Sequence, residues 1–278
     1  MAPMLRLFAT LLTIIVVLGT AGVIAAYVAF ARDINADVER LVNEAKPSGI
    51  IVTDAMLSNL PAPAQRYLRH AGVVGQPIPR LVRLTQKGRI RASATTNWMT
   101  FEADETYSTN SPAFVWHAAF PSPLMPMVQG RDEYVAGEGS IQVRALSLFP
   151  IADEHGDEMR AAGLMRYLNE AVWFPAVLLG SNVTIAAADA NSFQVTLTDR
   201  GLTARAVLSV DALGRLTNFR AQRFEINSGE VQTWETPISS YGVLNGLQLP
   251  TGGSAVWKLP AGDLDYIELE ITSLKYEN

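Results

Sequence analysis

Histidine is the side chain best suited to acid–base chemistry near neutral pH, and this chain has only 3 of them. None of His70, His117 and His155 lies in an H-E-x-x-H arrangement or at metal-ligand spacing from another. The acidic stretch around His155 is more typical of a solvated helix N-terminus than of a metal site. His117 falls on a predicted strand, either as a hydrogen-bonded sheet residue or as a general base. We therefore assign no catalytic residue, no metal and no cofactor.

One segment, 166–175, combines opposite charges with large aromatic side chains. Arg166 and Glu170 are four residues apart on a predicted helix, a spacing at which opposite charges attract. Trp173 adds a large apolar face and one N–H donor, which suit the wall of a binding site. We expect Glu170 and Trp173 to face a cavity covered by this helix. The alternative is a structural ion pair beside core aromatic residues.

Further candidates for ligand binding lie on the predicted strands and in one loop. The segment 120–127 is rich in proline and methionine, and methionine adapts to irregular apolar partners; the alternative is a plug of core residues. Arg223 alternates with Phe219 and Ala221, so if it faces inward it needs a buried partner such as Glu170. The alternative is an Arg223 that faces outward. The complete set of candidate ligand-binding residues is Trp116, His117, Phe120, Met125, Glu170, Trp173, Arg223 and Trp257.

Composition excludes several functional classes. Hydrophobic residues make up 49% of the 278 residues and charged residues 18%, which argues against a disordered chain. The net charge of -5 excludes a strongly basic nucleic-acid binder. The chain has no cysteine, which rules out disulfides, thiolate metal sites and cysteine nucleophiles. The sequence also contains no P-loop and no G-x-S-x-G motif.

The N-terminal segment, 1–31, predicts a membrane anchor. Leu7 to Ala31 carries no charge and is long enough as a helix to cross a hydrocarbon core of about 30 Å. The alternatives are a cleaved signal peptide, whose apolar core is usually only ~7–15 residues, and a buried soluble helix. Counts of Lys and Arg alone favour a cytoplasmic C-terminal domain, whereas long domains cross largely regardless of charge. We expect a single-pass protein whose C-terminal domain lies in the periplasm or outside the cell.

Residues 32–79 are predicted to form a helical linker and an N-terminal helix. Apolar residues at helical spacing continue to residue 45. A further helix begins near Asp54, is interrupted at two prolines, resumes at Ala64 and ends at Gly72.

From Leu81 onward the hydrophobic period becomes two, which indicates half-buried antiparallel strands. Residues 80–278 are therefore predicted to form an antiparallel β domain, with an amphipathic helix at 157–173 inserted into it. The predicted fold class is mainly β with helices (α+β). An N-terminal transmembrane helix precedes a curved antiparallel sheet or half-barrel of about eleven strands, with the second helix inserted mid-sheet.

Three sets of residues resemble a bacterial family of unknown function whose members carry an N-terminal membrane anchor. They are Leu60–Leu68, Arg166–Leu179 and a looser series of Tyr241, Gly246, Pro250, Trp257 and Tyr266. The resemblance covers about Leu60 to Tyr276 and implies a bacterial inner-membrane location, but it implies no activity.

The order of the elements is also similar to that of the half-barrel of periplasmic lipoprotein carriers (LolA-like). That fold curls about eleven antiparallel strands around a hydrophobic cavity closed by helices. The resemblance implies a cavity here as well, although a fold by itself does not define a function.

Three functions remain open at this point. The first is a membrane-tethered, non-catalytic protein that binds a lipid or other hydrophobic ligand in a half-barrel cavity. The second is a membrane-anchored structural module that holds a protein partner through its edge strands. The third is a hydrolase that uses isolated carboxylates, such as Glu102 and Glu170, with His117.

Overall fold

The computed structural model describes residues 2–121 and 128–278, so the candidate Met125 lies outside the described residues. In the described chain, fourteen strands form one antiparallel sheet with the order β6-β5-β4-β3-β2-β1-β14-β13-β11-β10-β9-β8-β7, and β12 pairs with β13. The strands are β1 (Leu81–Ile90), β2 (Met99–Ser108), β3 (Ala113–Phe120), β4 (Val128–Val135), β5 (Glu138–Ala145), β6 (Phe149–His155), β7 (Val183–Asp189), β8 (Ser192–Asp199), β9 (Leu202–Val210), β10 (Leu216–Glu225), β11 (Glu230–Glu235), β12 (Ile238–Leu244), β13 (Leu247–Leu259) and β14 (Gly262–Glu277).

The expectation of about eleven strands was therefore too low. The two end strands of the sheet, β6 and β7, expose most of their residues on both faces. A period of two appears in a sequence only where one face of a strand is buried, so such edge strands carry little signal.

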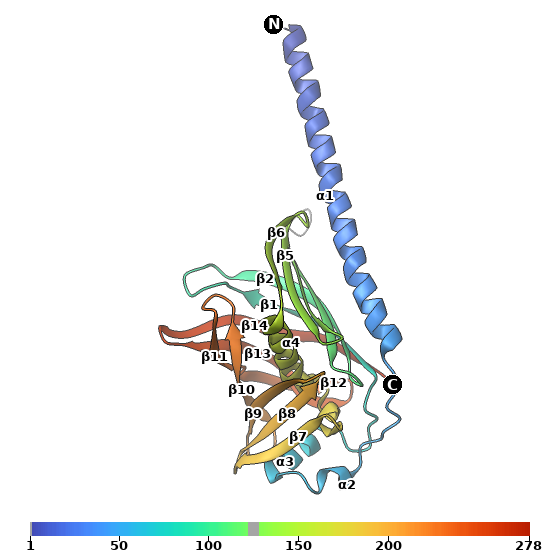
Figure 1. Ribbon diagram of the computed structural model, residues 1–278, viewed down its shortest axis with the longest axis vertical. Coiled ribbons are helices and arrows are strands. Elements are labelled where there is room, and N and C mark those ends of the chain that lie inside the picture. The colour runs from blue at the N-terminus through green and yellow to red at the C-terminus, as the bar shows by residue number, and fades with distance from the viewer. Residues whose placement is uncertain (1, 122–127) are drawn as a thin grey trace.

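The sheet curls around the inserted helix α4 (Asp157–Glu170), as Figure 1 shows. Helix α4 contacts β4 and β5 on one wing of the sheet and β9 and β10 on the other. Two short 3-10 helices, η1 (Ala171–Trp173) and η2 (Pro175–Leu179), continue from it. Because the sheet path ends at β6 and β7 in the described chain, the structure is an open half-barrel with a helix in its concave side.

One end of the half-barrel is filled by a short helical segment. Helices α2 (Asp54–Leu57) and α3 (Ala62–Ala71) precede the sheet, and α3 packs against β8 and β13. Helix α3 begins two residues earlier than expected because proline is tolerated in the first turn of a helix. It ends as predicted at Gly72, whose φ of 82° is the left-handed conformation that glycine adopts without strain.

Helix α1 (Ala2–Glu44) is continuous through the apolar span and the predicted linker. Its N-terminal part projects away from the sheet (Figure 1), and its most apolar window has a mean hydropathy of 2.5 with none of it buried. Within the described residues it is the one helix long and apolar enough to cross a membrane.

The C-terminal part of α1 packs on the convex face of the sheet, opposite α4. Phe30, Ile34 and Leu41 are buried there together with outward residues of β3 and β4. Arg131 Nη1 donates a hydrogen bond to Asp37 Oδ2 at 2.6 Å, which joins β4 to the helix. The helix is therefore held against the sheet by apolar contacts and by a partly buried ion pair.

Candidate functional site

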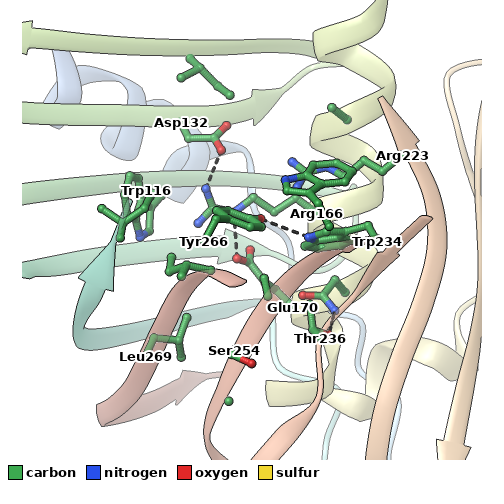
Figure 2. Close-up of a pocket in the computed structure, with 18 of the residues that line it drawn as sticks. Trp116, Asp132, Arg166, Glu170, Arg223, Trp234, Thr236, Ser254, Tyr266 and Leu269 are labelled. Atoms are coloured by element: carbon green, nitrogen blue, oxygen red, sulfur yellow. Dashed lines mark hydrogen bonds and ion pairs between the residues drawn. The ribbon is translucent and has the colours of Figure 1, made fainter. Parts of the chain in front are cut away.

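A cavity of about 450 Å³ lies between the concave face of the sheet and the helical segment α4–η1 (Figure 2). This volume is within the range of about 300–1,000 Å³ that is typical of small-molecule sites. Most of its lining is apolar, and strands from both wings of the sheet contribute to it. The curl of the sheet thus brings β3–β5 and β10–β14 to one space, although they are far apart in sequence.

Six of the eight candidate residues line this cavity. Strand alternation explains four of them, because they lie on inward faces of β3, β10 and β13. The other two come from the end of α4 and from η1. The six residues are Trp116, Phe120, Glu170, Trp173, Arg223 and Trp257.

His117 is not among the residues that line the cavity. Its two neighbours on β3 face inward, so His117 faces outward. Its ring nitrogen Nε2 forms a hydrogen bond with Gln129 Oε1 at 2.8 Å. Glu102 on β2 alternates with the buried Phe101, so it also faces outward. Glu170 faces the cavity, whereas Glu102 and His117 lie on the other face of the sheet, so the structure separates Glu170 from the two groups with which the hydrolase hypothesis would combine it. We therefore leave His117 out of the proposed binding site.

Arg166 is the centre of a buried charge cluster at one wall of the cavity. Its guanidinium donates to Asp132 Oδ2 at 2.5 Å, to Glu170 Oε1 at 2.8 Å and to Glu105 Oε1 at 3.1 Å. Figure 2 shows Arg166 lying between Asp132 and Glu170. The side chain of Glu105 is fully buried, with 0% exposed. The pair Arg166–Glu170 predicted from helical spacing is thus one part of a larger network.

Glu105 and Asp132 belong to the buried charge cluster, although the sequence did not single them out as candidates. Phe101 and Ala103 were recognised as one face of a strand, and the same period places Glu105 on that face. Likewise Asp132 lies between the inward Gly130 and Tyr134 on β4. A carboxylate on an otherwise apolar strand face was the available signal, because a buried charge requires a partner.

The cluster holds three carboxyl groups around one guanidinium, so it has surplus acid. Burial raises the pKa of Glu105 well above its usual range, and the neighbouring Glu170 carboxylate raises it further. Burial also raises the pKa of Glu170, against the effect of Arg166. Burial lowers the pKa of Arg166, but the three carboxylates raise it by more, so the guanidinium stays charged. The folded cluster therefore retains protons to a higher pH than the unfolded chain does.

This surplus predicts that stability falls as pH rises. An unfolded glutamate titrates near ~4.3, whereas the buried groups titrate higher, so the folded state binds more protons above that pH. Their stabilising contribution is complete below ~4.3 and is lost as pH rises through the folded pKa. We expect Glu105→Gln to flatten this decline in the free energy of unfolding, measured by urea titration at several pH values. The exposed Glu102 is the matched control: Glu102→Gln should keep the wild-type slope, and equal slopes for all three proteins would contradict the prediction.

The opposite wall of the cavity is aromatic. Trp257 stacks on Tyr266 with ring centroids 6.0 Å apart, and Trp234 Nε1 donates a hydrogen bond to the Tyr266 hydroxyl at 3.1 Å. The Arg223 guanidinium carbon lies 4.5 Å from the centre of the Trp234 ring, a cation–π contact. No ion pair joins Arg223 to Glu170 among the described residues; Glu170 instead accepts hydrogen bonds from Arg166 and Tyr107.

The described residues contain no group of three or more His, Cys, Asp or Glu side chains able to hold a metal ion. The carboxylates of the buried cluster point at Arg166, whose guanidinium fills the position a cation would take. What the cavity offers chemically is an apolar volume between aromatic side chains, with a few polar groups at fixed places. A lining of this kind is typical of sites for apolar molecules, in which a few polar groups fix the orientation.

The fold and the site define an open antiparallel half-barrel with a helix-covered apolar cavity. The chain belongs to the family of unknown function DUF6544, whose sequence profile matches residues 50–269. This confirms the expected membership in a family of unknown function.

Ten solved chains are similar to this chain in structure, including the following two. One is a LolA superfamily protein from Nitrosomonas europaea, with 12% sequence identity and a TM-score of 0.46, covering 77% of this chain and 94% of the other. The second is described as an outer membrane lipoprotein-sorting protein domain from Vibrio parahaemolyticus. It has 9% sequence identity and a TM-score of 0.41, and the match covers 71% of this chain and 86% of the other. No curated protein matches the sequence.

Proposed function

We propose that this chain is a membrane-tethered protein that binds a lipid or another hydrophobic ligand in the half-barrel cavity and does no chemistry on it. The observation that carries the proposal is the cavity itself. A volume of about 450 Å³ lined mostly by apolar side chains is costly to leave exposed to water, and an apolar ligand removes that cost. The polar groups at its edge then orient the ligand.

Helix α1 supports the tether. Its apolar part is exposed over the whole of the most hydrophobic window, as a lipid-facing helix requires. Residues 29–31 have the small-x-small pattern of a signal-peptide cleavage site, but they lie inside the continuous helix, and Phe30 is only 3% exposed because it packs against the sheet. An uncleaved helix that docks on the sheet by its end would hold the half-barrel close to the bilayer.

The β5–β6 hairpin gives further support. Phe149 and Ile151 are 58% and 61% exposed, although both are strongly apolar. The hairpin runs beside α1 toward its N-terminus (Figure 1), and Arg144 on β5 lies 5.1 Å from the Phe30 ring. Its tip is therefore level with the end of the apolar span, where exposed apolar side chains would enter the membrane surface.

The test is to identify what the cavity retains. The full chain would be extracted from native membranes, transferred into nanodiscs of one synthetic phosphatidylcholine, and analysed by lipid mass spectrometry. We expect a lipid other than the host lipid, in a fixed ratio to protein. Ala255→Phe should reduce this ratio at least about threefold, because Ala255 is buried in the cavity lining and the added ring occupies ligand volume.

Ala186→Phe is the matched control, because it makes the same substitution at an exposed position on β7. It should leave the retained lipid unchanged. Absence of any retained molecule from the wild-type chain, together with a failure of added lipids to bind, would contradict the proposal. That result would favour the alternative of a membrane-anchored module that holds a protein partner.

A further inference from the structure

Arg223 is a cation in the cavity with no carboxylate within ion-pair distance among the described residues. Its guanidinium carbon lies over two indole rings, 4.5 Å from the centre of Trp234 and 5.9 Å from that of Trp257. Its Nε is buried and has no hydrogen-bond partner. Stacking on aromatic faces holds the guanidinium in place but leaves the buried Nε–H donor without an acceptor.

The nearby acids are already engaged elsewhere. Glu225, two positions along the same strand, accepts hydrogen bonds from the backbone N–H of Asn227 at 3.1 Å and of Ser228 at 2.7 Å. Glu170 accepts from Arg166 and Tyr107. Neither carboxylate is therefore placed to neutralise Arg223.

Two more donors in the same cavity are unused. The Nε1 atoms of Trp116 and Trp173 are buried without a hydrogen-bond partner, although both side chains line the cavity. Leaving a buried donor unpaired is unfavourable, because the donor has lost its hydrogen bonds to water without gaining a partner. The cavity thus has spare hydrogen-bond donors and a spare positive charge, while its carboxylates already accept bonds from protein groups. A ligand that fits this pattern supplies acceptors and negative charge.

The shape of the cavity limits the apolar part of such a ligand. Its volume of about 450 Å³ suits one long acyl chain better than the several chains of a large lipid. We propose that the cavity binds a single-chain amphiphile with a compact anionic head group, a carboxylate or a phosphate, that pairs with Arg223. This inference rests on the proposed function and adds the class of the ligand.

The test uses the full chain in phosphatidylcholine nanodiscs with a photoactivatable palmitate, which carries a diazirine on its chain. Cross-linked peptides identify where the probe lies. Unlabelled palmitate, its methyl ester and hexadecylamine then compete at equal mole fractions in the disc. We expect palmitate to compete at least about tenfold better than the ester, and the amine to be the weakest. Lysophosphatidate in a further arm distinguishes a phosphate from a carboxylate.

Two arginines on β10 provide matched variants. Arg223→Met keeps a long apolar stem and should lower the affinity for palmitate at least about tenfold while leaving that for the ester unchanged. Arg220, on the same strand but 63% exposed in its side chain, is the control, and Arg220→Met should change neither. Arg223→Lys keeps the positive charge and should retain part of the preference for palmitate over its ester. This variant therefore distinguishes an effect of the lost charge from an effect of misfolding.

The outcomes are distinct. Labelling of the cavity with equal competition by palmitate and its methyl ester would overturn the head-group assignment while leaving a hydrophobic-ligand function in place. No labelling of the cavity by any probe would overturn both. If the Arg223→Met variant still preferred palmitate over its methyl ester, another group would bind the anionic head group. That result would contradict the role of Arg223.

Discussion

Replacing Arg166 by methionine should lower the free energy of unfolding at pH 7 by about 3–5 kcal/mol. The substitution leaves Glu105, Asp132 and Glu170 without the cation that all three contact. The loss exceeds that of a surface ion pair because these carboxylates are almost fully removed from water. It should shrink at acid pH, because protonated carboxyl groups no longer need a cation. Urea unfolding of the full chain in nanodiscs, followed by tryptophan fluorescence, measures the effect.

Arg160 on the same helix is the matched control for this prediction. Its side chain is more exposed than that of Arg166, and it pairs with Asp157 and Glu138, whose side chains are 91% and 76% exposed. Arg160→Met should therefore cost less than about 1 kcal/mol. If Arg166→Met were no more destabilising than Arg160→Met, the buried cluster would contribute little to stability. Its carboxylates would then have to find partners without the guanidinium.

Replacing Gly139 by alanine should displace α4 from β5 and distort the cavity. A Cβ at this position would collide with the backbone carbonyl of Met159 and lie 2.9 Å from the backbone N of Arg160. Backbone atoms of a helix cannot move independently, so the whole of α4 must shift or β5 must bend. We expect a loss of at least about 1–3 kcal/mol in the free energy of unfolding and a weaker retention of ligand.

Gly130→Ala on the adjacent strand is the control for this second prediction. Its added Cβ would face the Trp116 ring at 3.4 Å, which is an ordinary contact with a side chain. Because Gly130 itself lines the cavity, the control compares stability alone, and the free energy of unfolding in urea should stay close to wild type for Gly130→Ala. If the two variants behaved alike, the close approach of α4 to β5 would not be what defines the cavity.

The elements around the site were largely predictable because their signals are local. Helix α4 shows as a helical period, the turn at Gly72 needs a left-handed residue, and the buried strands alternate with a period of two. The anchor-like part of α1 shows as an uninterrupted apolar run. The alternation also indicated that Arg223, with Phe219 and Ala221, lies on one strand face.

The same alternation left two questions open: whether Arg223 faces inward, and which group it would meet. It lies between two tryptophans from β11 and β13 rather than beside Glu170, because Glu170 is held by Arg166 and Tyr107. Edge strands such as β6 and β7 give little signal for a related reason, since residues solvated on both faces have no periodic pattern.

The sequence by itself therefore determined the type of each element and the buried face of each central strand, because both depend on neighbours within a few residues. Only the tertiary structure decided which inward residues share a space. Glu105 and Asp132 are 61 and 34 positions from Arg166, and they meet it because both lie in register with Trp116 on the strands that flank β3, against which α4 packs. Arg223 and Trp257 come from the other wing, and the curl of the sheet brings them to the same cavity. The degree of curl depends on the packing of α4 against both wings, a long-range property with no local pattern.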